Sequence, residues 1–335
     1  MTRKHRKVSI QQVADEAGIS PTTVSFIMNG KGRISEATRA NVLAIADRLG
    51  YRPSAAAIAL ATGRSNILAL AFPRAYTPPF GLTEIDYFDR AIRAATKHAL
   101  GLSYSLIIIP PGQEASLVAR MPLDGVVVFD PVRDEPLTGD PRRMPPIVTV
   151  GRVLDGGDDL TYVDNDHVEG TTRVLDHLVA VGAPEPALFV ADLRDSYTAD
   201  CQSAYEKWCA AHGVAVSSHA LLPQNRASVT AALESLAGRG RPLGVYANDD
   251  ALSRSVVHCA AEMGLRIPED LMLVAGSDRT DFAGFGIDLT TLSVDPGNLA
   301  VAAIDLLVAR LTADTPPASR ILPTRLEVRA START

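Results

Sequence analysis

From residue 67 onward, short continuous apolar runs alternate with longer segments in which apolar residues recur every three or four positions. The short runs predict buried strands over residues 67–72, 104–109, 124–129, 146–150, 187–190, 243–246 and 271–275. The periodic segments predict helices over residues 84–100, 167–180, 199–212, 228–236, 251–263 and 296–311. Apolar strands that alternate with helices are typical of a mostly parallel sheet covered on both faces, so the body is predicted to be α/β. About 270 residues are long for one such sheet and favour two doubly wound subdomains.

The first sixty residues follow a purely helical pattern. Ser9 and Gln12 predict a capping box at the start of a first helix, and Gly18 predicts its end. Ser20 predicts the cap of a second helix, with Pro21 at the first helical position. The few residues between the two helices indicate a helix-turn-helix. A third helix is predicted between Ser35 and Gly50.

The second helix has two predicted faces. Three apolar residues spaced for one face would pack on the first helix: Val24, Ile27 and Met28, against Val13, Ala14 and Ala17. Four residues on the other face would point away: Thr22, Ser25, Phe26 and Asn29.

Charge is distributed unevenly along the chain. Residues 1–65 hold ten Lys or Arg and four Asp or Glu, a formal charge of +6, which leaves −11 for the remainder of a chain whose total is −5. A basic helical head on an acidic body indicates a DNA-binding module joined to a second domain.

Tyr51-Arg52-Pro53 breaks the helical pattern, because the residue before a proline is pushed out of the helical region. The alanine-rich segment that follows is too short to form a stable helix alone. We therefore predict boundaries that divide the chain into residues 1–53, 54–64 and 65–335; the resemblance described below implies that these are a DNA-binding domain, a hinge, and a ligand-binding and dimerisation domain.

The head carries the ordered motifs VADEAGIS, TTVS, NGKGRIS and LGYRP, and the body carries DGVVV, VDND, YANDDAL, MGLRIPEDLMLVAGSD and LTTLSVDP. In these motifs the chain resembles the lactose-repressor (LacI/GalR) family of bacterial regulators over nearly its whole length. The resemblance implies a headpiece on a periplasmic-binding-protein-like body of two α/β subdomains. It also implies a cytoplasmic homodimer that binds a double-stranded DNA operator, most often as a repressor. A small-molecule effector, such as a sugar or another small polar metabolite, would bind between the subdomains.

The resemblance also implies roles for residues of the head. Thr22, Ser25, Phe26 and Asn29 would face base edges or phosphates. Residues expected near the phosphate backbone are Ser20, Pro21, Thr23, Tyr51 and Arg52, because helix N-termini attract anions and the last two match backbone contacts of the family. Leu60 falls at the place of a leucine that the family wedges into the minor groove.

Phe26 departs from the family pattern, which commonly has an arginine that reads guanine. A phenylalanine can contact a thymine methyl, so one hypothesis is that this protein prefers a T-containing step there. The alternative is that Phe26 packs against a neighbouring helix.

Asn248 and Asp278 each follow a predicted strand, where ligands bind in open α/β sheets. In the family these two positions bind the effector. Cys201 stands where relatives carry an arginine of the pocket, and Ser277 and Val294 also depart from the pattern. Aromatic candidates for stacking on a ring are Tyr76, Phe80 and Tyr197, and a charge could come from Arg74 or Arg194. A conventional sugar is therefore in doubt.

Other chemistry has little support in the sequence. Three scattered cysteines predict neither disulfides nor a zinc site, and we expect no cofactor, no metal and no membrane span. Catalytic motifs and phosphate-binding glycine loops are absent from the sequence, so an enzyme is disfavoured. His167 and His177 are interpreted as solvated helix residues. The rival hypothesis is a cytosolic small-molecule binding protein with a degenerate DNA head.

Overall fold

The computed structural model describes residues 8–28, 30, 32–52, 63–72, 86–109, 111–133, 135–138, 144–154, 160–239, 241–278, 286–313 and 315–333. The chain divides into two compact units, Met1–Asn66 and Ile67–Thr335. The hinge predicted over residues 54–64 stays a prediction, because only residues 63 and 64 of it are described.

The first unit holds the three predicted helices: α1 Ile10–Ala17, α2 Pro21–Met28 and α3 Glu36–Leu49. The predicted caps are confirmed. Ser9 and Gln12 form a capping box, and Gly18 and Gly50 end α1 and α3 with left-handed backbone. The Oγ of Ser20 accepts a hydrogen bond of 3.1 Å from the Thr23 amide at the start of α2.

One apolar core holds the three helices together, as predicted for α1 and α2. Its buried members are Val13, Ala14, Val24, Ile27, Val42, Ile45 and Ala46, with Ala17 and Met28 packed at its edge. Arg39 of α3 donates a hydrogen bond of 3.2 Å to the carbonyl of Ile27, which joins α3 to the end of α2. The orientation of α2 is therefore set both by its buried face and by its C-terminus.

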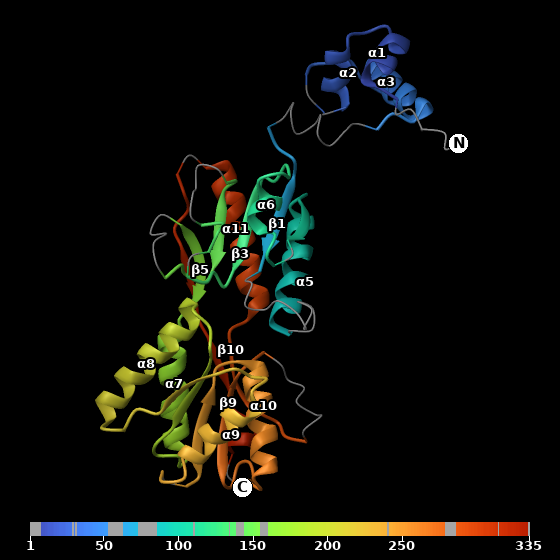
Figure 1. Cartoon of the computed structure of the whole chain (residues 1–335). Helices are drawn as coiled ribbons and strands as arrows, with labels where there is room; N and C mark the ends of the chain where they lie inside the picture. Colours follow the sequence, from blue (N-terminus) through green and yellow to red (C-terminus); the bar gives the residue numbers. More distant parts are fainter. Residues whose placement is uncertain are drawn as a thin grey trace. The chain divides into compact units, whose positions relative to one another are not determined.

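The second unit contains two α/β subdomains, each with one six-stranded sheet (Figure 1). In the first sheet all neighbouring strands are parallel, in the order β11-β5-β4-β3-β1-β2. Its strands are β1 Ile67–Ala71, β2 Ser105–Ile109, β3 Gly125–Phe129, β4 Ile147–Val150, β5 Thr161–Asn165 and β11 Arg320–Leu322. Its helices are α5 Asp86–Gly101, α6 Glu114–Val118 and α11 Pro296–Thr312.

The second sheet has the order β12-β10-β9-β8-β6-β7, and only the pair of β10 and β12 is antiparallel. Its strands are β6 Ala187–Ala191, β7 Ser218–Leu221, β8 Leu243–Ala247, β9 Leu271–Gly276, β10 Thr290–Ser293 and β12 Arg325–Glu327. The helices of this subdomain are α7 His167–Ala180, α8 Ser196–His212, α9 Arg226–Ser235 and α10 Asp250–Glu262, followed near the end by the short helix η4 Ala330–Thr332.

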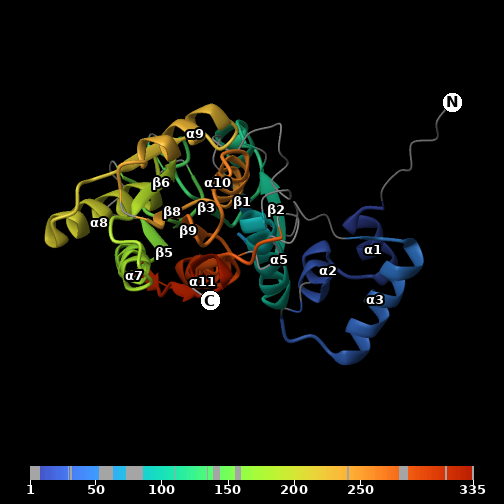
Figure 2. The same cartoon turned by 90° about the horizontal axis from the view of Figure 1, so that it is seen from below.

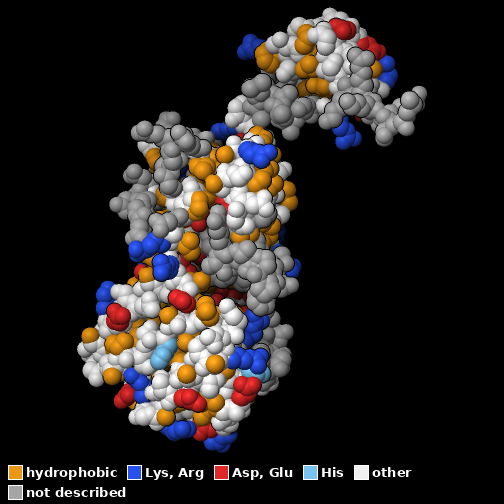
Figure 3. Space-filling view, viewed as in Figure 1, with side chains coloured by type: hydrophobic (Ala, Val, Ile, Leu, Met, Phe, Trp, Pro, Cys, Tyr) orange, Lys and Arg blue, Asp and Glu red, His pale blue; other side chains and the backbone are white. Residues whose placement is uncertain are grey.

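Both sheets are covered on both faces, which explains why their central strands are apolar throughout. In the first subdomain α5 and α11 lie side by side on one face (Figure 2), and α6 packs on the other. In the second subdomain α7 and α8 cover one face and α9 and α10 cover the other. On the face seen in Figure 3, apolar side chains are interspersed with charged ones of both signs. Within the described residues, no helix combines the length and the apolar character that a membrane crossing needs.

The chain passes between the subdomains where β5 leads into α7, where β10 leads into α11, and where β11 leads into β12. Two of these passages are hydrogen-bonded to each other. The amide of Asp166 donates a bond of 3.0 Å to the carbonyl of Leu322, and the Nδ2 of Asn165 donates to the same carbonyl at 3.3 Å. The subdomains are thus joined by paired extended segments beside the edge where the parallel strands end.

Candidate functional site

The outward face of α2 is the candidate interface of the head. Thr22 and Phe26 are exposed, with 46% of Phe26 accessible, and Ser25 is half-buried. Phe26 does not belong to the core of the head, so its ring is available on the surface. Whether it reads a base stays a prediction.

The N-terminus of α2 supplies the remaining polar groups of this face. The Oγ atoms of Ser20 and Thr23 lie 2.8 Å apart, and Pro21 begins the helix as predicted. Tyr51 is half-buried against the core of the head, and this burial raises the pKa of its hydroxyl. Arg52, the next residue, is exposed. Asn29 and Leu60 lie outside the described residues, so their predicted contacts stay predictions.

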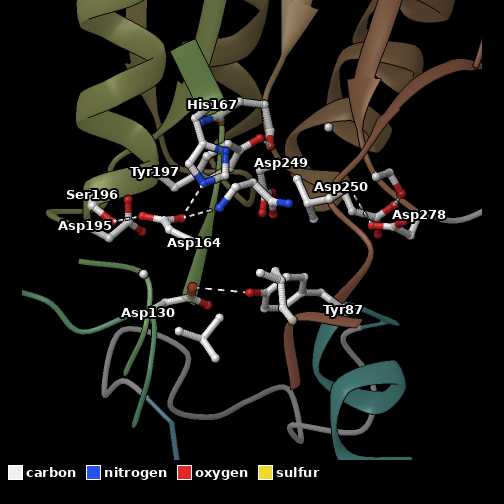
Figure 4. Close-up of a pocket in the computed structure, with 18 of the residues that line it drawn as sticks. Tyr87, Asp130, Asp164, His167, Asp195, Ser196, Tyr197, Asp249, Asp250 and Asp278 are labelled. Carbon is white, nitrogen blue, oxygen red and sulfur yellow. Dashed lines mark hydrogen bonds and ion pairs between the residues drawn. The ribbon is translucent and has the colours of Figure 1, made fainter. Parts of the chain in front are cut away.

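A cavity between the two subdomains is the candidate small-molecule site (Figure 4). It lies where the sequence predicted, at the carboxyl ends of the strands, and the N-termini of α5, α7, α8 and α10 also face it. Asn248, Asp278 and Tyr197 line it, together with Ser277 and Val294. Tyr76, Phe80 and Arg74 lie outside the described residues.

Aspartates dominate the lining of the cavity. Seven of the lining residues are aspartates: Asp86, Asp130, Asp164, Asp195, Asp249, Asp250 and Asp278. Among the described residues that line the cavity there is no lysine or arginine. The described lining is therefore strongly acidic.

Asp130 follows β3 with backbone in the left-handed region, at φ +41°, which is uncommon for a residue other than glycine. Its carboxylate accepts a hydrogen bond of 3.3 Å from the Tyr87 hydroxyl, which comes from α5 (Figure 4). Burial, together with the nearby charges of Asp195 and Asp164, raises the pKa of Asp130 well above its usual range.

Asp164 and His167 form a buried pair. The Nε2 of His167 lies 2.8 Å from the Oδ1 of Asp164, and the Nε of Arg152 lies 3.6 Å from its Oδ2. The prediction that His167 is a solvated helix residue is wrong, because this ring is 6% exposed and faces the cavity. The same prediction for His177 is wrong as well, since it is partly buried, its Nε2 lies 2.8 Å from the Thr332 hydroxyl, and burial lowers its pKa.

Two of the aspartates that line the cavity also cap helices. Asp195 accepts a bond of 2.7 Å from the Thr198 amide and Asp249 one of 2.9 Å from the Leu252 amide. Burial raises the pKa of Asp195, and it raises the pKa of Asp249 to about 6. These caps partly offset the cost of placing carboxylates in the cavity wall.

Asp278 accepts hydrogen bonds from the Ser293 hydroxyl and from the amides of Val294 and Asp295, the last two at 3.3 and 3.2 Å. It therefore holds the segment between β10 and α11. Burial raises the pKa of its carboxyl group.

The side chain of Asn248 is used within the protein: its Oδ1 accepts a bond of 3.1 Å from the Ala191 amide. Its carbonyl accepts a bond of 2.6 Å from the Tyr197 hydroxyl. The absence of a side chain at Gly276 permits this arrangement, because a Cβ there would lie 2.2 Å from the Asn248 carbonyl oxygen.

Cys201 is fully buried in the core between α7, α8 and the second sheet, and it does not line the cavity. Burial raises the pKa of its thiol to about 12. Arg194 is exposed and is not among the lining residues either. The structure thus gives no support to an effector contact by either side chain.

Sequence reasoning missed Asp130, His167 and the aspartates at the helix N-termini. The rule that identified Asn248 and Asp278 could have found Asp130, which follows the apolar strand β3, whereas Asp164 lies in β5, a strand without a continuous apolar run.

Comparisons with known proteins agree on both parts of the chain. Residues 9–54 match the family described as "Bacterial regulatory proteins, lacI family", and residues 175–332 match the "Periplasmic binding protein-like domain". The HTH-type transcriptional repressor PurR of Photobacterium profundum is 24% identical over 317 residues, covering 90% of this chain and 92% of that protein. Catabolite control protein A of Priestia megaterium is 25% identical over 338 residues, covering 97% and 99%.

Solved structures share the fold. The Lac repressor dimer bound to operator and the anti-inducer ONPF has a TM-score of 0.81 at 21% identity, covering 98% of this chain and all of that chain. The complex of the transcriptional regulator CelR with cellobiose has a TM-score of 0.69 at 23% identity, covering 97% and 100%.

Proposed function

This chain belongs to the LacI family of bacterial regulatory proteins, and on that premise we propose that it is an operator-binding repressor controlled by a small molecule. The observation that carries the DNA-binding part is the outward face of α2, which is exposed on a capped and tightly packed three-helix head. Thr22, Ser25 and Phe26 would contact base edges, while the N-terminus of α2 and Arg52 would contact phosphates.

The protein would act as a homodimer, with two copies of α2 in successive major grooves of a pseudo-palindromic operator. Apolar side chains at the edge of the first sheet support self-association. Ile108 on the edge strand β2 and Leu100 and Leu102 just before it are 43%, 62% and 39% exposed. Residues 54–64, with Leu60, would form the hinge that orders on the operator.

The effector would bind in the cavity between the subdomains. Because the cavity walls come from both subdomains, a ligand there favours one angle between them over another. That angle would be coupled to the two hinges of the dimer and so to operator affinity. A regulator of this kind works in the cytoplasm, where the chromosome is, and needs no catalytic step of its own.

The test is fluorescence anisotropy of the full-length protein with labelled DNA from upstream of its own gene. We expect tight binding that weakens steeply as salt rises from about 50 to 200 mM, because phosphate contacts release counterions. The Thr22→Ala variant should bind about tenfold more weakly, whereas the Thr172→Ala variant, altered on α7 of the body, should bind like the wild type.

The alternative function, a small-molecule binding protein whose head no longer recognises DNA, is supported by the unusual Phe26. A protein that binds no DNA sequence at any salt concentration, yet binds a small molecule in its cavity, would be a small-molecule binding protein with a degenerate head. That result would remove the regulatory proposal.

A further inference from the structure

Within the described part of the chain, the aspartates that line the cavity outnumber the arginines that pair with them. Of the seven aspartates, Asp86, Asp164 and Asp250 form ion pairs, with Arg90, Arg152 and Arg254. The other four form no ion pair with any lysine or arginine in the described part of the chain; they are Asp130, Asp195, Asp249 and Asp278. Among the described residues, a ligand that enters this cavity therefore meets four carboxylates without an ion-pair partner.

Two buried acceptor atoms in the lining have no donor among the described residues. Asn165 is 4% exposed, and its Nδ2 points to the carbonyls of Leu322 and Pro323, so its unpaired Oδ1 is turned the other way. The Nδ1 of His167 is also unpaired. In a neutral imidazole whose Nε2 donates to the Asp164 carboxylate, which only accepts, Nδ1 is the ring's acceptor.

The unpaired groups all require a hydrogen-bond donor. Unmatched buried acceptors cost free energy until a donor reaches them. Asp130 has only the long hydrogen bond from Tyr87 as a side-chain partner in the described part of the chain, and its strained backbone places it opposite Asp164 and Asp195 (Figure 4). Backbone strain of this kind is found most often at functional sites.

Aromatic rings complete the walls. Tyr87 comes from α5 and Tyr197 comes from α8, so aromatic residues of both subdomains line the cavity, whereas the ring of Phe88 is buried in the core of the first subdomain. Ring faces attract organic cations, and carboxylates bind ammonium groups through charge-assisted hydrogen bonds. The described residues include no group of His, Cys, Asp and Glu placed to hold a metal ion, which argues against a divalent cation as the occupant.

Resting on the proposed function, we infer that the effector is a small organic amine, whose ammonium group is held by Asp130 and by the buried acceptors Asn165 Oδ1 and His167 Nδ1. The ammonium donates three hydrogen bonds and brings the positive charge that the lining lacks.

The pKa shifts agree with this reading. Burial raises the pKa of Asp130, Asp195, Asp249 and Asp278, because removal from water disfavours the charged carboxylate until a cation approaches it. A neutral polyol could donate to the acceptors but would leave these charges uncompensated. The experiment must therefore separate charge from hydrogen-bond donation.

Matched ligand pairs make that separation. The melting temperature of the full-length protein is measured with putrescine against 1,4-butanediol and with glucosamine against glucose, with magnesium chloride as a further arm. We expect at least one amine to raise the melting temperature, and its neutral partner to raise it less or not at all. Equal shifts within both pairs, a larger shift for a neutral ligand or for magnesium, or no shift with either amine would overturn the inference.

A matched pair of variants tests the location. Asp130→Asn removes one charge from the cavity, and asparagine tolerates left-handed backbone, so the fold should persist. Asp192→Asn makes the same change on an exposed residue that does not line the cavity. By isothermal titration the amine should bind Asp130→Asn about tenfold more weakly and Asp192→Asn with unchanged affinity. Equal affinities of both variants would mean that the amine binds the acidic surface non-specifically.

The same samples separate this inference from the proposed function. Operator binding is measured by anisotropy without any ligand. If the protein binds its operator but prefers neutral ligands, the proposed function stands and the inference that the effector is an amine is wrong. A protein that binds amines in the cavity but no DNA refutes the regulatory function instead.

Discussion

The Nη2 atom of Arg152 lies 2.6 Å from each carboxylate oxygen of Asp200, across the boundary between the two subdomains. Arg152 follows β4 in the first subdomain and Asp200 belongs to α8 in the second. The amide of Arg152 also donates a bond of 3.0 Å to the Ser196 hydroxyl at the start of the same helix. These contacts join the subdomains beside the cavity, and under the proposed function the angle that they favour is the quantity that an effector would change.

Replacing Arg152 by alanine should alter regulation more than stability. The guanidinium is partly exposed, so its pair with Asp200 contributes at most about 1 kcal/mol to the free energy of unfolding, and Asp164, its second partner, keeps its contact with His167. The angle between the subdomains responds to a bias of similar size, so the ligand concentration that half-releases the operator should shift several-fold. The measurement is operator anisotropy titrated with effector.

Arg93→Ala is the matched control for Arg152→Ala. Arg93 forms an ion pair with Asp89 within α5 alone, away from the boundary between the subdomains. An equal shift of the release concentration in both variants would show that the contact between Arg152 and Asp200 does not set the angle.

Asp249→Asn should stabilise the protein increasingly as pH rises. Burial raises the pKa of Asp249 to about 6 in the folded state, from a usual value near 4, so the folded protein binds more protons than the unfolded chain between these values. The wild type therefore loses stability as pH rises through this window, by up to about 3 kcal/mol. The asparagine keeps the helix cap without the buried charge.

The measurement for Asp249→Asn is denaturant unfolding at several pH values between about 5 and 8. The stability difference from the wild type should grow across this range and level off above about pH 7. A constant difference for Asp249→Asn would mean that its carboxylate is ionised without cost.

The helices of the head were predicted almost completely from the sequence, because the residues that determine their ends and faces lie close together in the chain. Capping residues such as Ser9 and Ser20, a glycine such as Gly18, and the spacing of Val24 and Ile27 determine helix ends and faces within a few residues. The surface of α2 follows directly from them. The contacts of these residues with DNA depend on a partner outside the chain, so they stay predictions.

The strands that sequence analysis missed lie mostly toward the edges of the sheets or beside the passages between the subdomains. They are β5, β7, β10, β11 and β12. Edge strands such as β7 and β11 contain exposed and polar residues, so they lack the continuous apolar run that revealed the central strands. Their pairing depends on partners distant in sequence, which no local pattern encodes.

The residues that line the cavity were predicted only in part, for the same reason. Asn248 and Asp278 were found because each follows an apolar strand. Asp195 and Asp249 begin helices, and their sequence context indicates caps, which is a role they also have. Only the packing of the two subdomains makes them walls of one cavity.

Asp278→Ala should destabilise the body and reduce its response to the effector. The change leaves the Ser293 hydroxyl and the amides of Val294 and Asp295 without their acceptor, at a cost of about 1–3 kcal/mol. Asp278→Asn keeps an acceptor oxygen and avoids the buried charge, so it should lose less stability. Denaturant unfolding measures both.

Asp192→Ala on the exposed surface is the control for Asp278→Ala, and it should unfold like the wild type. If Asp278→Ala also unfolds at the wild-type denaturant concentration, then Asp278 does not hold the segment between β10 and α11. A ligand-induced rise in melting temperature that persists in Asp278→Ala would remove this residue from the effector site.

Phe26 provides the sharpest test of the head. Because nearly half of its side chain is exposed, Phe26→Ala should change the free energy of unfolding by less than about 1 kcal/mol, whereas Ile27→Ala, in the core, should cost about 2–5 kcal/mol. In a binding-site selection the wild type should recover thymine at one position of each half-site, and Phe26→Arg should recover guanine there, because arginine donates two hydrogen bonds to guanine. A wild type that selects guanine at that position, or a Phe26→Ala variant as unstable as Ile27→Ala, would assign Phe26 to packing instead of base recognition.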